Sequence, residues 1–200
     1  MRRRRKHILL LAAVLLAAFA GLVTAAGRDF SYGSGTGGFV KLDGEYVSTS
    51  FGFSIRYPLG WSVLANEEEV GNHVTFSSRP LDDFATEPFI PLHEAKIAIY
   101  VLPNQNSQNL DDWIHELDAR DPYPPVIESL ERRVIGGQEA RVNIENILGT
   151  NSAVAYIPYR GKVYLIMGPP IESVYASLFL EMLGTFQFEV ASADVNASSF

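Results

Sequence analysis

The sequence predicts an α+β domain built on an antiparallel β-sheet. Large and small side chains alternate over residues 51–57, the period of a strand with one buried face. Short turns at residues 136–137 and 160–161 each join two β-rich runs, as in β-hairpins, whose strands are antiparallel. Residues 110–120 and 171–183 instead repeat their apolar side chains with helical spacing. The hairpin strands are expected at residues 130–135, 138–146, 153–159 and 162–167.

The first predicted strand, residues 51–57, ends at a proline. Its large side chains share the face that we expect to lie on the core: Phe51, Phe53, Ile55 and Tyr57. Pro58 cannot donate to a strand ladder, and Gly60 permits a chain reversal. We therefore expect a second strand, residues 61–64, to fold back beside the first, with Trp61 filling the core.

Two more strands are expected at residues 73–78 and 95–102. The second is apolar on both faces, which is typical of a strand in the middle of a sheet. Between them, residues 80–94 form a long irregular stretch that contains three prolines. Because long loops in compact domains are often functional, we expect a binding rim here.

Both predicted helices have one apolar face. Residues 110–120 follow Asn109, the expected N-cap, and place four apolar side chains together: Leu110, Trp113, Ile114 and Leu117. Residues 171–183 stop at Gly184 and are expected to cover the sheet. Their broad apolar face comprises Ile171, Val174, Tyr175, Leu178, Phe179, Met182 and Leu183. A last short strand is expected at residues 185–188.

The N-terminus carries the pattern of an export signal. Five consecutive cationic residues, positions 2–6, precede nineteen almost wholly apolar ones, residues 8–26. A Lys or Arg at mid-membrane costs roughly 2.5–3.5 kcal/mol, so we expect the cationic run to stay in the cytoplasm and the body to lie outside. Nineteen residues at about 1.5 Å each just span a hydrocarbon core of about 30 Å. Two outcomes stay open: an anchor retained through residues 8–26, or secretion after cleavage near Ala26.

The rest of the chain divides into three regions by composition. Residues 27–44 are rich in glycine and serine and are expected to form a flexible tether after the signal or anchor of residues 1–26. Residues 45–190 have the commonest size of a single globular domain. Residues 191–200 are small and polar, and we expect a disordered tail.

The exported body is strongly acidic. Of the 16 basic residues, five belong to the N-terminal run, so 11 remain against 23 acidic residues, a net charge of −12. A field of this sign repels phosphates, which argues against nucleic-acid binding and against binding to anionic lipid surfaces. Because the chain has no cysteine, disulfides, thiol catalysis and Cys-ligated metals are excluded. Because the acidic body does not favour anionic lipids, we expect the protein to contact the membrane only through its N-terminal segment.

Two stretches at the ends of the domain carry a family resemblance. The opening Phe51-Gly-Phe-Ser-Ile-Arg-Tyr-Pro-Leu-Gly-Trp61 and the closing Leu183-Gly-Thr-Phe-Gln-Phe188 resemble the PsbP-like family, over residues 45–188. That family is named for an extrinsic subunit of the oxygen-evolving photosystem. The resemblance implies an antiparallel sheet with helices on both faces, an α/β/α sandwich. It also suggests a cation-binding accessory subunit of a membrane complex, with Ca²⁺ or Mn²⁺ as the ion.

One set of residues has metal-binding chemistry. On the outer face of the first helix, His115 lies between Asp111 and Asp118, at spacings of four and three residues. Two carboxylates and an imidazole on one face could hold a divalent cation. The alternative is the solvated side of an amphipathic helix, where the same spacing is common. The acidic runs at residues 67–69 and 82–83 lack the alternate spacing and the glycine of a calcium loop.

Catalytic motifs are missing from the sequence, which contains no Gly-x-Ser-x-Gly, Ser-x-x-Lys or His-Glu-x-x-His. We therefore expect a non-enzymatic binding or accessory domain without a cofactor, acting outside the cytoplasm on a protein or small-ligand partner at the cell envelope. The cation-binding subunit is the first alternative. An envelope hydrolase is the second, because a triad of a serine with His73 or His93 is recognised by geometry and not by sequence.

Overall fold

The computed structural model describes residues 40–66, 73–80, 92–120, 125–147 and 149–189. The predicted leader, the disordered tail and all but the last five residues of the predicted tether lie outside these ranges. So do the acidic runs at 67–69 and 82–83 and most of the predicted binding rim, residues 81–91.

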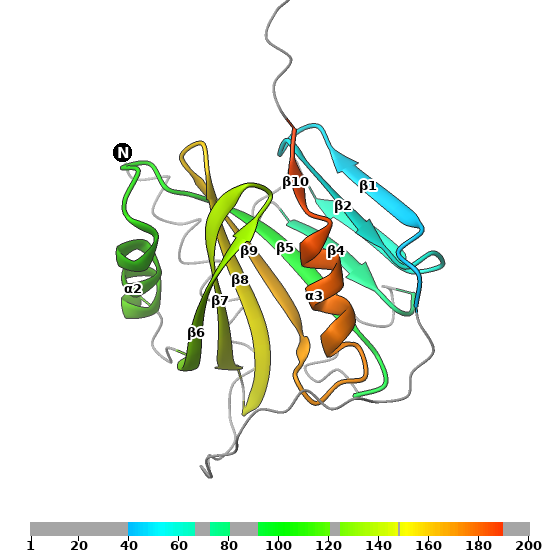
Figure 1. The fold of residues 1–200 in the computed structure, drawn as a ribbon. Coiled ribbons are helices and arrows are strands. Elements are labelled where there is room, and N and C mark those ends of the chain that lie inside the picture. The colour runs from blue at the N-terminus through cyan, green and yellow to red at the C-terminus, as the bar shows by residue number, and fades with distance from the viewer. Residues whose placement is uncertain (1–39, 67–72, 81–91, 121–124, 148, 190–200) are drawn as a thin grey trace, which may run out of the picture.

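The described chain forms two antiparallel sheets and two helices (Figure 1). The strands of the N-terminal half are β1 (Gly44–Ser48), β2 (Phe53–Tyr57), β3 (Ser62–Asn66), β4 (His73–Ser77) and β5 (Lys96–Pro103). The remaining elements are α2 (Leu110–Arg120), β6 (Val126–Ile135), β7 (Gln138–Ile147), β8 (Thr150–Tyr159), β9 (Lys162–Pro170), α3 (Ala176–Gly184) and β10 (Gln187–Phe188). The predicted α+β class with antiparallel pairing is confirmed.

The larger sheet has seven strands in the order β3-β4-β5-β9-β8-β7-β6. Its central strands include β5, as the apolar pattern on both faces predicts, with β4 and β9 as neighbours. Both predicted hairpins form: β6 pairs with β7 and β8 pairs with β9. In both turns the chain takes positive φ angles, at Gly136, Gly137, Arg160 and Gly161.

The smaller sheet corrects one prediction. The strand after the Pro58 turn was expected to lie beside β2, but β3 pairs with β4 in the larger sheet. Both edges of β2 are taken, by β1 along its full length and by β10 at Ser54 and Phe53. The strand β1 begins at Gly44, inside the predicted tether, and a side chain at this position would meet the Tyr57 ring at 2.9 Å. The turn that separates β2 from β3 therefore moves the chain from one sheet to the other.

The second helix is shorter than predicted. Its predicted start at Ile171 follows Pro170, and the Ile171 N–H donates to the carbonyl of Asn151 on β8, 2.8 Å away. The helical ladder begins only when the Phe179 N–H donates to Tyr175, so α3 starts at Ala176. Val174, placed on the buried face by helical spacing, is 66% exposed. The first helix, α2, has the predicted bounds.

A large aromatic cluster fills the space between the two sheets and α3. Phe53 of the small sheet stacks on Phe186, with ring centroids 5.1 Å apart. The Tyr164 hydroxyl of β9 donates to the carbonyl of Phe51, 2.6 Å away, and so joins the larger sheet to the turn between β1 and β2. The largest fully buried side chains include Tyr164, Phe53, Phe76, Phe179, Phe186, Ile55, Ile97, Ile99, Ile157, Ile166 and Met182.

A second, smaller cluster holds α2 against the sheet. Three side chains of the helix contact three from β8 and β9: Leu110, Trp113 and Ile114 with Val154, Tyr156 and Val163. The Trp113 indole N–H also donates to the carbonyl of Pro103 at 3.2 Å. Among the described residues, neither helix has both the length and the apolarity needed to cross a bilayer.

Candidate functional site

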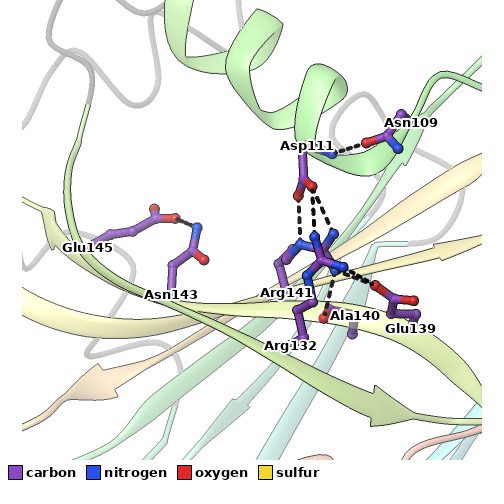
Figure 2. A network of polar contacts seen from close by, with 8 residues as sticks. All are labelled: Asn109, Asp111, Arg132, Glu139, Ala140, Arg141, Asn143 and Glu145. Carbon is purple, nitrogen blue, oxygen red and sulfur yellow. Dashed lines mark hydrogen bonds and ion pairs between the residues drawn. The ribbon is translucent and has the colours of Figure 1, made fainter.

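The most developed polar arrangement in the described chain lies along β7, next to α2 (Figure 2). Arg141, Asn143 and Glu145 occupy alternate positions of this strand and are only 5%, 0% and 3% exposed. Their neighbours Ala140 and Val142 belong to the large cluster, so the three polar side chains point to the other side of the strand. We call these three residues the β7 polar row.

At one end of the row, Arg141 binds the first turn of α2. Its Nε and Nη2 donate to Oδ1 and Oδ2 of Asp111 at 2.6 and 2.8 Å, a bidentate ion pair. Its Nη1 donates to Glu139 at 3.0 Å. The hydrogen bonds from Arg141 hold the pKa of Asp111 below its usual value. Arg132 adds positive charge, 3.9 Å from Asp111 and 3.4 Å from Glu139.

The start of α2 is fixed in the same place. Asn109 acts as the predicted N-cap, since its Oδ1 accepts the Asp111 N–H at 2.9 Å. The carboxylate of Asp111 therefore lies at the positive end of the helix dipole and against a buried guanidinium at once. This arrangement clamps the helix to β7.

At the other end of the row, Glu145 accepts two hydrogen bonds on one oxygen. The Tyr156 hydroxyl donates to its Oε1 at 2.8 Å, and the Asn143 amide donates to it at 3.1 Å. Burial is the main cause that raises the pKa of Glu145, and the charge of Asp118 adds to it. Burial also raises the pKa of Tyr156. Among the residues that the structure describes, no donor contacts the buried Asn143 Oδ1.

The predicted metal ligands are not brought together. In the ranges that the structure describes, no three His, Asp or Glu side chains converge so that they could hold a metal ion. Both oxygens of Asp111 are engaged by Arg141, a cation already in place. His115 is exposed, and Asp118 is half-buried on the same helix. The helical spacing correctly predicts that these residues share one surface of the helix. It does not predict that Arg141 of the sheet lies against Asp111.

The two histidines considered for a triad, His73 and His93, have other neighbours in the described part of the chain. The His73 ring on β4 lies 5.6 Å from the Tyr100 ring, centroid to centroid. The side chain of His93 is 80% exposed, and its Nε2 lies 3.7 Å from a carboxylate oxygen of Glu94. Within the described residues, neither imidazole forms a hydrogen bond with a serine, and the triad geometry is not present there.

Sequence reasoning missed the β7 polar row. The strand alternates polar and apolar residues, a pattern that predicts a solvated face, yet α2 packs over the polar positions. Arg141 and Asp111 are 30 residues apart, so a single sequence gives no sign that they meet. This ion pair, buried only on its Arg141 side, becomes visible once the helix is docked.

Solved structures with a similar fold were found, but no family model and no curated protein matches the sequence. The solution structure of cyanobacterial PsbP (CyanoP) from Synechocystis sp. PCC 6803 matches with a TM-score of 0.50 at 17% identity. The match covers 77% of this chain and 96% of that one. The chain has a PsbP-like fold. The resemblance read from the two ends of the domain is thereby confirmed.

Two other solved structures match with lower TM-scores. A Bacteroides thetaiotaomicron protein matches with a TM-score of 0.44 at 16% identity, over 74% of this chain and 49% of that one. The Saccharomyces cerevisiae Ran-binding protein Mog1p matches with a TM-score of 0.44 at 14% identity, over 72% of this chain and 94% of that one. At such identities the likeness concerns the fold alone.

Proposed function

We propose that this chain is a non-enzymatic accessory domain that works outside the cytoplasm and binds a protein or small-ligand partner at the cell envelope. The proposal rests on one observation: the buried charged side chains of the described domain are bound by other side chains of the same domain. Its most buried charged side chain, Glu145, is bound by Asn143 and Tyr156, and Arg141 is bound by Asp111 and Glu139. Arg141 thereby joins α2 to β7, and Glu145 joins β7 to β8, so both groups have structural tasks.

The N-terminal sequence supports the location. A cationic run followed by nineteen apolar residues favours export, with the body held at the membrane through residues 8–26 or released after cleavage near Ala26. The PsbP-like fold fits an accessory role, since the family is named for an extrinsic subunit. The acidic balance of the body favours a partner with a basic surface.

We also infer the α/β/α layering that the family resemblance implies. Along β8, Val154 and Tyr156 contact α2, while Ala153, Ala155 and Ile157 belong to the large cluster with α3. Since successive side chains of a strand point to opposite faces, this alternation supports one helix on each face of the larger sheet.

Export is tested by protease access in intact cells that express the full chain with a C-terminal tag. After the outer permeability barrier is opened, we expect the tagged domain to be degraded while a cytoplasmic marker survives. Deleting residues 2–26 is the control, and this variant should be protected. Full protection of the unaltered chain would contradict the proposed location.

Binding is tested by crosslinking in the same cells, followed by identification of what is captured. We expect one recurrent envelope partner, lost when the body is denatured before crosslinking. Turnover of a defined substrate by the purified chain, together with no recurrent partner, would replace the proposal with the envelope hydrolase.

A cation-binding accessory subunit is the second candidate. It is favoured by the buried Asn143 Oδ1, which has no hydrogen-bond partner among the described residues. The Asn143 side chain lies beside the buried carboxyl group of Glu145, whose pKa is raised by burial and by the charge of Asp118. Oxygen atoms of this kind are the ligands of Ca²⁺ and Mn²⁺. Calorimetry with each ion separates the candidates: binding that Glu145→Gln abolishes supports a site here. No heat and no shift in melting temperature would remove this candidate.

A further inference from the structure

The outer edge of the larger sheet is formed by β6, a strand of ten residues that pairs only with β7 in the described part of the chain. Its register with β7 shifts between Ile127 and Ser129, and from Ser129 to Ile135 the pairing is regular. The hairpin turn then ends the strand. The regular edge is therefore seven residues long, and Arg132 is its middle residue.

The two residues that flank this middle residue carry opposite charges. Glu131 precedes Arg132 and Arg133 follows it, and both flanking residues pair with core positions of β7, Val142 and Ala140. They therefore point to the same face of the sheet. Their side chains are 58% and 37% exposed, and Nη2 of Arg133 donates to Oε2 of Glu131 at 2.9 Å.

The charges of β6 are complementary to those of a second β6 strand that runs in the opposite direction. In an antiparallel pair of two β6 strands centred on Arg132, Glu131 of each copy lies directly opposite Arg133 of the other. Opposite charges in directly facing positions stabilise a strand pair. Two such cross-copy pairs form, whereas the two-fold registers centred on Glu131 or on Arg133 form none.

The central residue would face its own copy, which places two guanidinium groups near each other. Each is already neutralised within its chain, because Arg132 lies 3.4 Å from Glu139 and 3.9 Å from Asp111. Val134, two residues away, is 76% exposed and gains cover from the facing strand. The pairing thus adds cover and charge contacts without leaving a bare positive charge at its centre.

We propose that β6 is the docking edge for a second copy of this chain, which forms a two-fold dimer with one continuous sheet. The opposite edge of the sheet differs: β3 has five residues, Ser-Val-Leu-Ala-Asn, none of them charged, so it has no charge pattern to select a register. If the chain is anchored as proposed above, two copies on one membrane meet at a raised effective concentration, and a short edge contact is sufficient. The dimer itself does not depend on the anchor.

The absence of cysteine from the chain makes a crosslinking test direct. In the proposed pair, two copies of Arg132→Cys have their Cα atoms about 4.5–5.5 Å apart, within the disulfide range of about 4.4–6.8 Å. With the full chain in cell envelopes and a copper–phenanthroline oxidant, we expect most of this variant to run as a disulfide-linked dimer. The two cysteines of Val134→Cys are offset by four residues, roughly 13 Å, and should not link.

Leu64→Cys is the matched control on the other edge, on an exposed residue of β3. Random collisions would link it as readily as Arg132→Cys, and equal linkage would overturn the proposal. So would the absence of any linked dimer from Arg132→Cys while the melting curve of that variant shows it to be folded.

Charge reversal tests the register. In the Arg132→Cys background, Glu131→Arg places like charges opposite each other and should lower the linked fraction severalfold, as should Arg133→Glu. The double reversal restores both opposite pairs and should restore linkage. Loss of linkage in the double variant, or no loss in either single one, would contradict the proposed pairing. Export and partner capture are measured separately, so a failure here leaves the proposed function in place.

Discussion

The large cluster under α3 and the smaller cluster under α2 are stabilised by different kinds of interaction. The first is almost wholly apolar and aromatic, with rings of Phe53, Tyr164 and Phe186 in contact. The second combines a few apolar side chains with the buried charges of the β7 polar row. Apolar contacts hold α3 in its position, whereas α2 is held by apolar contacts and by the ion pair between Asp111 and Arg141. The two clusters should therefore respond differently to mutation and to pH.

The largest effect is expected in the aromatic cluster. Phe53→Ala removes a ring that is fully buried and contacts Phe186 and Tyr164, so we expect the free energy of unfolding to fall by about 3–5 kcal/mol. Urea denaturation followed by fluorescence measures the loss. The exposed Leu59, replaced by alanine, is the matched control and should change the free energy by less than about 0.5 kcal/mol. Similar small losses in both variants would show that the ring is not part of the core.

A smaller loss is expected at the ion pair. Asp111→Ala leaves the Arg141 guanidinium buried without its bidentate partner, although Glu139 remains. Because the Asp111 side chain is itself 43% exposed, solvent reduces the effect, and we expect a loss of about 1–2 kcal/mol. Asp112→Ala, one residue along in the same turn, is the control and should lie within about 0.5 kcal/mol of the unaltered chain. Equal effects of the two variants would mean that the ion pair contributes nothing.

The helix cap should contribute slightly less. Asn109→Ala removes the acceptor of the Asp111 N–H and should cost about 1 kcal/mol. Asn109→Asp keeps an acceptor and should cost little. Thermal unfolding by circular dichroism compares the two, and a larger loss from the aspartate variant would contradict the capping role.

The smallest change is expected for Glu145→Gln, where the sign and the pH dependence matter more than the size. The raised pKa means that the folded state holds a proton on Glu145 more tightly than the unfolded state, so stability falls as pH rises from about 4.5 through the raised value. Glutamine resembles the protonated form, and at neutral pH this variant should be as stable as the unaltered chain or up to about 1 kcal/mol more stable. Unfolding free energies between pH 4 and 8 measure the slope. An unchanged slope in the variant would contradict this assignment.

Asp111 should show the opposite dependence. Its lowered pKa stabilises the folded state above the usual carboxyl pKa of 3.8, and this stabilisation is lost as pH falls through the lower folded value. The unaltered chain and Asp111→Ala should therefore become more similar in stability at acid pH. The two ends of the β7 polar row would thus have pH dependences of opposite sign.

Local patterns predicted much of the fold. The period-two alternation around Phe53, the two-residue turns and the helical spacing of α2 are short-range signals, and each element formed where its pattern indicated. Pairing between distant strands was harder. The partners of β2 are β1, a strand that no local pattern predicted and whose first residue lay in the predicted tether, and β10, more than a hundred residues away. No local pattern indicated that β3 belongs to a different sheet.

The candidate site was less predictable than the fold. The sequence drew attention to Asp111 as a metal ligand, and the structure instead places it on Arg141, a residue with no motif around it. Glu145 and Asn143 looked like surface residues because they alternate with apolar ones. Burial of such residues depends on which helix packs over the strand, and that depends on the tertiary structure.

The central claim is that the charges beneath α2 hold the helix to the sheet. A double-mutant cycle of Asp111→Ala and Arg141→Met in the full chain, measured as unfolding free energies at neutral pH, tests it most directly. We expect a coupling energy of about 1–2 kcal/mol, with the double variant losing clearly less than the sum of the single losses. Single losses that simply add, with no coupling, would contradict the claim.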